Sequence, residues 1–236
     1  MTPGLSIITP AWKVKDFISD YLRSFYKQGW IKKNENWEIM IGVDGCKESL
    51  REFKKRVQKN TRIFWFPKNV GPYLIRNTLA YKAAYSKLLF FDADDIAGKE
   101  LISDIMINFE KSLITFTMER FPGPPRRKGT VGQFAIDKSL FQSFGGFLPW
   151  RVEADSEFLG RLKRNGIERI RLRDQVDVLR RRHKHQLTRM SSTGSKSQLR
   201  SGLRKIKKEG WKKGLKEIVP CFAECIEIEN PKGIAS

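Results

Sequence analysis

The segment Lys87–Asp95, KLLFFDADD, constrains the fold of this chain more than any other stretch of its sequence. Its apolar run LLFF is typical of a strand buried on both faces, as in a parallel sheet. The run ends in three carboxylates, Asp92, Asp94 and Asp95. Crowded carboxylates repel one another unless a cation lies between them, and open α/β sheets bind ligands at this end of their strands. The segment predicts a divalent metal holding a phosphorylated ligand; the alternative is an Asp-rich turn capping the next helix.

Strands and helices alternate in the first half of the chain. The expected strands are Leu5–Thr9, Trp37–Val43, Arg62–Phe66 and Leu88–Phe91, and the expected helices are Lys15–Tyr26, Leu50–Val57 and Asn69–Ser86. Apolar residues at helical spacing mark the first helix, and Pro72 stands near the first turn of the third, where proline is tolerated. This order predicts an α/β protein with a mostly parallel sheet and right-handed crossovers.

The second half is less regular. Helices are expected at Lys99–Lys111, Lys138–Phe144 and Ala154–Asn165, and strands at Leu113–Met118, Thr130–Ile136, Glu168–Arg173 and Gln175–Arg182. The Pro- and Gly-rich segment Phe121–Lys128 predicts an exposed loop. From Ser191 onward a polar stretch leads into a basic helix, in which Gly210 is expected to be a break.

Charge is the strongest compositional signal. The 236 residues carry a formal net charge of +20, and Lys and Arg are densest in Arg180–Lys216. Such an excess predicts an anionic partner: a nucleic acid, a phosphorylated substrate or an acidic membrane surface. The alternative is a solvated basic face that aids solubility.

Other features bound the cellular context. No stretch approaches the ~20 apolar residues of a membrane span, and the N-terminus does not resemble a signal peptide. The three cysteines, Cys46, Cys221 and Cys225, are odd in number and widely split, which argues against a disulfide framework and a zinc site. We therefore expect a cytoplasmic protein, peripheral at the membrane surface if its basic tail binds lipid.

Several motifs occur in the order found in one known family. They are LSIITPAW at 5–12, EIMIGVDGC at 38–46, KNVGPYLIRNTLA at 68–80, FFDADD at 90–95, FGGF at 144–147, EADSEFLGRL at 153–162 and RRHKHQLT at 181–188. Together they resemble the nucleotide-sugar-dependent glycosyltransferases of family 2, over about residues 4–190. The resemblance implies a GT-A fold: a Rossmann-like, mostly parallel sheet flanked by helices, here with a basic helical extension. It divides the chain into a glycosyltransferase domain, 1–190, with a nucleotide-binding half (1–97) and an acceptor-side half (98–190), and the extension, 191–236.

The same resemblance implies an activity: a metal-dependent, inverting, hexosyltransferase-type enzyme. It would move a sugar from a nucleotide-sugar donor, a UDP-sugar first of all, to a hydroxyl of a glycan or lipid-linked acceptor. The residues it assigns to the donor are Thr9, Pro10, Asp44, Arg76, Asp92 and Gly146. It assigns Mn²⁺ or Mg²⁺ to Asp92, Asp94 and His183, and the role of general base to Asp155.

Each of these residues also has a structural interpretation. Asp95 is a candidate helix cap, and Arg76 a candidate salt-bridge partner of Asp92 or Asp95. Asp44 is in a position typical of a turn before Gly45, and Gly145-Gly146 of a helix C-cap. His183 and His185 lie among arginines that would also bind phosphate or nucleic acid.

The residues flanking the base leave further alternatives open. Glu153 and Glu157 are rivals of Asp155, which itself suits a helix N-terminus. The aromatic residues Trp12, Phe147 and Trp150 are candidates to stack on sugars, although most aromatics should be core.

Two departures from the family pattern leave other functions open. Val43 replaces the first Asp of an Asp-Asp-Gly pair, and Ala154 stands where the family often has Glu. A degenerate sugar-nucleotide binder is therefore one alternative. A nucleotidyltransferase would need a Gly-rich loop after the first strand, which TPAWKVKDF does not provide. Nucleic-acid binding lacks a recognisable motif, so the basic tail is assigned to an anionic membrane or glycan.

Overall fold

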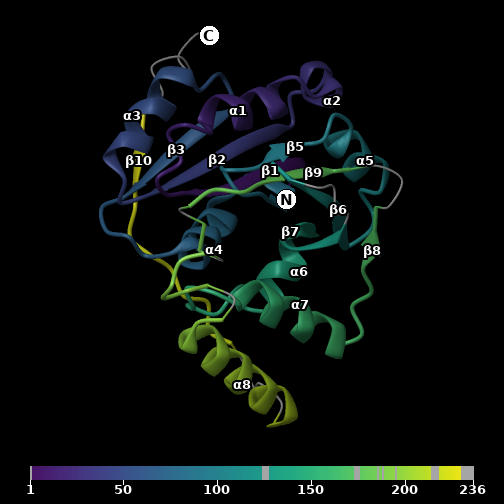
Figure 1. Ribbon diagram of the computed structural model, residues 1–236. Helices are drawn as coiled ribbons and strands as arrows, with labels where there is room; N and C mark the ends of the chain where they lie inside the picture. The colour runs from purple at the N-terminus through teal and green to yellow at the C-terminus, as the bar shows by residue number, and fades with distance from the viewer. Residues whose placement is uncertain are drawn as a thin grey trace.

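A ten-stranded sheet organises the fold (Figure 1). The computed structural model describes residues 2–123, 128–172, 176–184, 186–187, 189–194, 196–213 and 218–229. The strands are β1 (Thr2–Ala11), β2 (Trp37–Asp44), β3 (Thr61–Phe66), β4 (Tyr85–Phe90), β5 (Ile96–Ala97), β6 (Leu113–Phe121), β7 (Lys128–Asp137), β8 (Ile170–Arg171), β9 (Val178–Arg181) and β10 (Ile226–Ile228). They are ordered β10-β3-β2-β1-β4-β7-β6-β9-β5, with β8 beside β6.

The sheet changes direction next to β4. Strands β3, β2, β1 and β4 are parallel, as the alternation of strands and helices predicts. Strand β7 then pairs antiparallel to β4, and β6 antiparallel to β7. The carboxyl ends of the parallel strands meet at one edge, which puts Asp44, the last residue of β2, on the same side as the turn after β4. The predicted α/β fold with a largely parallel central sheet is confirmed.

Helices cover both faces of the sheet. The helices are α1 (Ile18–Tyr26), α2 (Gly29–Lys33), α3 (Lys47–Arg56), α4 (Pro72–Lys82), α5 (Leu101–Ile107), α6 (Lys138–Ser143), α7 (Ala154–Arg164) and α8 (Gln198–Lys213). Figure 1 shows α1, α2 and α3 on one side of the sheet and α4, α6 and α7 on the other. Because neighbouring strand residues face opposite sides, Ile7 and Ile39 join one buried cluster whereas Ile8 and Met40 join the second. Burial on both faces explains the continuous apolar runs of the central strands.

The largest boundary correction concerns the third expected helix. Helix α4 ends at Lys82, and Tyr85 and Ser86 belong to β4 instead. The backbone N–H of Ala84 donates to Oε1 of the buried Glu38, 2.6 Å away, which fixes the extended chain after the helix. At the other end Gly71 has φ +93°, so the helix begins at Pro72 rather than Asn69.

The C-terminal segment is part of the folded body. Helix α8 continues through Gly210 to Lys213, so the expected break at that glycine is wrong. It projects below α7 in Figure 1. Strand β10, which the sequence pattern did not predict, pairs antiparallel with β3, and Arg62 on β3 forms an ion pair with Glu227 at 2.7 Å. Within the described residues, every helix is too short or too polar to span a bilayer.

Candidate functional site

A cavity of about 540 Å³ opens at the carboxyl ends of the central strands. Its lining includes most of the predicted site residues. Those that line it are Pro10, Asp44, Arg76, Asp92, Asp94, Asp155 and His183. Both halves of the chain therefore contribute to one cavity, as the topology of an open sheet requires.

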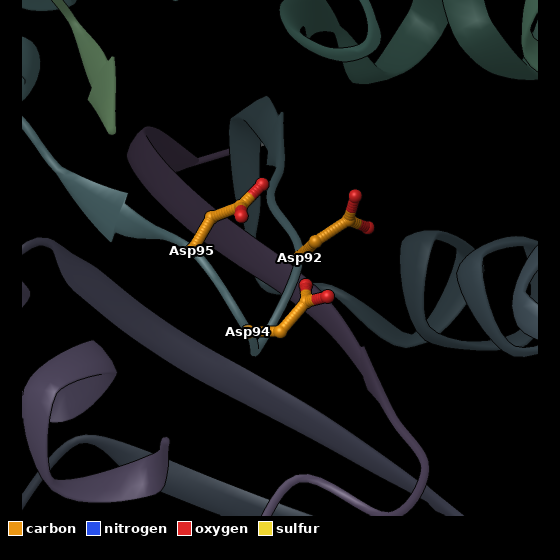
Figure 2. Close-up of side chains that lie close together, drawn as sticks. All are labelled: Asp92, Asp94 and Asp95. Carbon is orange, nitrogen blue, oxygen red and sulfur yellow. The ribbon is translucent and has the colours of Figure 1, made fainter. Parts of the chain in front are cut away.

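The acidic cluster lies in the turn that follows β4. Figure 2 shows Asp92, Asp94 and Asp95 spreading from this one turn, and one oxygen of each lies within 4.8 Å of the others. Nη2 of Arg76, on α4, lies 2.6 Å from Oδ1 of Asp92, so the predicted ion pair of Arg76 is formed. Asp92 and Asp94 are partly accessible to solvent, with 27% and 19% of their side chains exposed.

Asp95 has a different role from its neighbours. It is buried, and its carboxylate accepts hydrogen bonds from the Arg181 backbone N–H at 2.8 Å and from Nε2 of Gln133 at 2.5 Å. Burial, together with the charges of Asp94 and Asp92, raises its pKa well above the usual range. The alternative that Asp95 caps the next helix is wrong, because Glu100 stands at the N-cap of α5.

His183 reaches the acidic cluster from the segment after β9. Its Nε2 lies 2.7 Å from Oδ2 of Asp94, and its ring packs against Phe17 with centroids 4.7 Å apart. The structure thus brings His183 to Asp94 as predicted; His185 lies outside the described residues. An imidazole beside two accessible carboxylates is a donor set that suits Mn²⁺ or Mg²⁺.

Asp44 organises the opposite end of the cavity. Its carboxylate accepts hydrogen bonds from the backbone N–H groups of Val70, at 2.7 Å, and Gly71, at 3.0 Å, and from Nδ2 of Asn69. Burial raises its pKa, and these hydrogen bonds together with the charge of Arg151 oppose the rise. Val43, which replaces the first Asp of the family's pair, is a buried core residue.

Four predicted contacts lie elsewhere. The Thr9 hydroxyl is buried 2.5 Å from the Tyr21 hydroxyl, and Gly146 packs against Asn77 and Phe141 at the end of α6. The Phe147 ring is in the core, and Trp150 packs at its margin. The structure therefore does not bring Thr9 or Gly146 to the cavity; of the three candidate stacking aromatics, Trp12 lines it.

Asp155 lies in the first turn of α7, where the sequence placed the general base. Its Oδ1 accepts a hydrogen bond from the Ser156 backbone N–H at 2.8 Å. Oδ2 lies against Gly132 on β7, only 2.8 Å from where a β-carbon would stand. Tyr73, on α4, lies close to Asp155, and burial followed by the charge of Asp155 raises the pKa of Tyr73 well above its usual range. Residues of α4 and β7 therefore lie beside the Asp155 carboxylate of α7 at the cavity wall.

The two rival carboxylates are engaged in ion pairs. Glu157 is fully buried, and its Oε2 lies 2.8 Å from Nη2 of Arg161, which also donates to the Gly146 carbonyl at 2.9 Å. Glu153 stands at the N-cap of α7 with φ +69° and binds cations from α8. Ala154 is a core residue. Of the three, Asp155 is the carboxylate that faces the cavity without an ion pair to any residue that the structure describes.

Two arginines lie side by side above the acidic cluster. Arg120 on β6 and Arg180 on β9 are paired in register and line the cavity. Burial lowers the pKa of Arg180, but the charges of Asp95, Asp92 and Asp94 outweigh this and raise it. Neither arginine, nor Tyr73, Gln133 or Gly132, was singled out from the sequence. Tyr73 lies within the quoted motif at 68–80 but was given no role there, and the other four become candidates only when β6, β7 and β9 are brought together.

The sheet order and the strand-end carboxylates define a GT-A type of glycosyltransferase fold. Residues 6–163 match the sequence profile of glycosyl transferase family 2, more than half of the chain, and the chain belongs to that family. A putative teichuronic acid biosynthesis glycosyltransferase, TuaG of Bacillus subtilis (strain 168), is 28% identical over 122 residues, 50% of this chain and 43% of the relative. An uncharacterized glycosyltransferase of Rickettsia conorii is 32% identical over 107 residues, 44% of this chain and 17% of that protein. The chain thus spans less than half of these curated relatives.

Two solved structures share the fold at low sequence identity. TarS of S. aureus (residues 1–349), in complex with UDP-GlcNAc, superposes with a TM-score of 0.65 at 16% identity over 78% of this chain and 60% of that chain. The mannosyltransferase PcManGT of Pyrobaculum calidifontis, in complex with GDP-Man and Mn²⁺, has a TM-score of 0.64 at 14% identity, over 82% and 62%.

Proposed function

We propose that this chain transfers a sugar from a nucleotide-sugar donor, with a UDP-sugar as the first candidate, to a hydroxyl of a glycan or glycoconjugate. One observation carries the proposal: Asp92 and Asp94, from the turn after β4, and Asp155, from α7, line the same cavity. The TarS and PcManGT structures support it, because they contain UDP-GlcNAc and GDP-Man in the same fold. Their different nucleotides leave the base of the donor to be determined by binding.

The donor set fits a divalent cation. Asp92, Asp94 and His183 would hold Mn²⁺ or Mg²⁺, whereas both carboxylate oxygens of Asp95 already accept hydrogen bonds from protein groups. A bound cation neutralises the charge of the diphosphate as the glycosidic bond breaks. The hydrogen bonds of Asp95 to Arg181 and Gln133 fix the turn that carries Asp92 and Asp94.

Asp155 is the general base of the proposed reaction. It takes the proton of the acceptor hydroxyl, whose oxygen then bonds to the anomeric carbon of the donor while the bond from that carbon to the diphosphate oxygen breaks. Attack from the face opposite the leaving group inverts the anomeric configuration. A positioned carboxylate of this kind contributes about 10²–10⁴-fold to the rate. Tyr73 lies beside it, and the absence of a β-carbon at Gly132 leaves room for it.

The arginines of the cavity complete the arrangement. Arg76 neutralises Asp92, and Arg180 places a cation beside the acidic cluster without forming an ion pair to any described residue. A guanidinium in such a place stabilises the negative charge that develops on the departing nucleoside diphosphate.

Thermal unfolding with nucleotides tests this function. UDP, GDP, CDP and dTDP are each added with Mn²⁺ and with EDTA, and a ligand at 100 times its Kd should stabilise the protein by ~2.7 kcal/mol. We expect one nucleotide to stabilise in a Mn²⁺-dependent manner, and Asp94→Asn to abolish the effect. A donor-consumption assay then compares the native chain with Asp155→Asn, which should retain nucleotide binding and lose ~10²-fold or more in turnover. Stabilisation without any turnover by the native chain would instead support a degenerate sugar-nucleotide binder.

We further propose that the enzyme works in the cytoplasm, peripherally bound to an anionic membrane through α8. Leu199 and Ile206 are 43% and 56% exposed on this basic helix, a combination that suits the membrane interface. Flotation with anionic liposomes should weaken in a Leu199→Ser/Ile206→Ser variant. Point variants are preferable to truncation because residues 218–229 pack against α4 and β3; equal flotation of both proteins would contradict membrane binding.

A further inference from the structure

Helix α8 brings two cations, Arg200 and Arg204, to the wall of the cavity that holds Asp155, and a third, Lys207, contacts the same carboxylate as they do. Arg200, Arg204 and Lys207 lie on one face of the helix, at the spacing of successive turns. We call these three residues the α8 cation cluster. All three contact Glu153, the N-cap residue of α7: Arg200 at 2.7 Å, Arg204 at 3.0 Å and Lys207 at 3.2 Å.

The charges in this cluster do not balance. All three cations contact the one carboxylate of Glu153, and within the described residues no other acidic side chain forms an ion pair with Arg200 or Arg204. Lys207 and Arg200 are nearly buried, with 11% and 13% of their side chains exposed. Each has a further neutral acceptor, the Ser156 hydroxyl for Lys207 and the Thr193 carbonyl for Arg200. Hydrogen bonds to neutral groups satisfy the N–H donors but leave the excess positive charge in place.

Arg204 differs from the other two. It is 48% exposed, and it lines the cavity together with Arg200, Glu153 and Ser156. Glu153 is two residues from Asp155, so their Cα atoms are at most about 7 Å apart. The partly exposed guanidinium of Arg204 therefore lines the same cavity as the proposed general base, and it binds a residue that is close to that base in the chain.

We propose that the α8 cation cluster forms an anion subsite, so that the acceptor carries a phosphate or carboxylate group close to the hydroxyl that receives the sugar. The inference rests on the proposed glycosyl transfer and specifies its acceptor class. An anion docking here replaces solvent at Arg204 and supplies the charge that Glu153 alone does not balance. The cluster lies outside residues 6–163, so it belongs to this chain's own C-terminal segment rather than to the matched part of the family.

Binding of three labelled trisaccharides tests the subsite. The probes are maltotriose, maltotriose phosphorylated on a primary hydroxyl, and trigalacturonate, measured by fluorescence anisotropy with the full chain at low and moderate salt. We expect both anionic probes to bind at least tenfold more tightly than maltotriose. Arg204→Gln should weaken them about tenfold, the effect of one lost charge-assisted contact. Lys205→Gln, an exposed charge on another face of α8, should change them less than twofold.

The outcomes separate this subsite from its rivals. Equal losses in R204Q and K205Q would mean a general basic surface, and equal binding of maltotriose would mean a neutral acceptor; either result overturns the proposal. Binding of anionic vesicles that survives R204Q, without discrimination among the trisaccharides, assigns the charge to a membrane and also overturns it. Arg204→Lys, which keeps the charge, should retain most of the binding and controls for misfolding.

A parallel measurement keeps the two proposals distinct. Nucleotide-induced stabilisation depends on Asp94, whereas anionic-probe binding depends on Arg204. If no nucleotide stabilises the protein but R204Q still weakens trigalacturonate, the anion subsite stands and the glycosyl-transfer proposal fails. If the nucleotide effect is intact and the charged probes bind no better than maltotriose, the subsite fails alone.

Discussion

Replacing Glu153 by Gln removes the carboxylate that joins α7 to α8. Burial raises the pKa of Glu153, but hydrogen bonds from Arg200, Arg204, Lys207 and Ser156 outweigh it and lower the pKa from 4.5 to about 2. Each pKa unit corresponds to about 1.4 kcal/mol, which gives roughly 3.5 kcal/mol as an upper limit. Because Arg204 is 48% exposed, solvent screening reduces its share, and we take about 2 kcal/mol as the loss in unfolding free energy at pH 7.

The pH dependence of this loss has a definite sign. A carboxylate with a depressed folded-state pKa contributes its full stability above pH 4.5 and loses it as the pH falls through about 2. The stability gap between native protein and E153Q should therefore be widest at neutral pH and narrow steadily below pH 4.5.

Urea denaturation followed by circular dichroism at pH 7, 4.5 and 3 measures the difference in unfolding free energy between the native protein and E153Q, and thermal denaturation at pH 7 gives the two melting temperatures. At pH 7 the melting temperature of E153Q should fall by about 4–8 °C for a chain of this size. Glu209→Gln, on the exposed surface of α8, is the matched control and should change stability by less than about 0.5 kcal/mol. A gap that stays constant from pH 7 to pH 3, or an E153Q no less stable than the control, would refute the reasoning.

Three further predictions concern the site and the core. Gly132→Ala puts a β-carbon 2.8 Å from Oδ2 of Asp155, so kcat should fall about tenfold or more while nucleotide-induced stabilisation persists; unchanged kcat would contradict the placement of the base. Asp137→Ala leaves the fully buried Lys87 ammonium without its carboxylate and should cost about 3–5 kcal/mol in urea denaturation, a cost that Lys87→Met/Asp137→Ala should partly restore. Asn77→Ala removes hydrogen bonds to both backbone groups of Phe147 and to the Cys221 carbonyl, and should lower the unfolding free energy by about 3 kcal/mol; a loss below 1 kcal/mol would mean that water replaces the amide.

Local patterns predicted the central sheet because its strands are buried on both faces. Runs such as Trp37–Val43 carry this burial in their own composition, and Asp44 and Asp92 stand at or just after the ends of their strands. The third helix was predicted too long because the local sequence at Tyr85 and Ser86 is compatible with a helix as well as with a strand. Their assignment to β4 depends on pairing with β1 and on the distant Glu38, which no local window contains.

The candidate site was predictable to the extent that its residues lie in motifs. Asp94, His183 and Asp155 meet in one cavity, as expected, although their chemical roles remain predictions. Gln133 and Tyr73 were missed because their function depends on partners from other elements. Gly146 shows the opposite error: its position after a helix suits close approach to a ligand, but Asn77 and Phe141 occupy that space.

Strand β10 has a consequence for how the sheet meets its surroundings. Without it, β3 would be an edge strand of apolar residues with its backbone N–H and C=O groups open to pairing with another chain, which is how sheets aggregate. The three residues Ile226–Ile228 close that edge, and Glu227 places a charge on it that Arg62 fixes. A shortened protein that retained the whole region shared with the family, but ended before this strand, would keep its cavity and expose β3 as an edge strand that can pair with another chain. Its first defect would be poor solubility rather than lost chemistry.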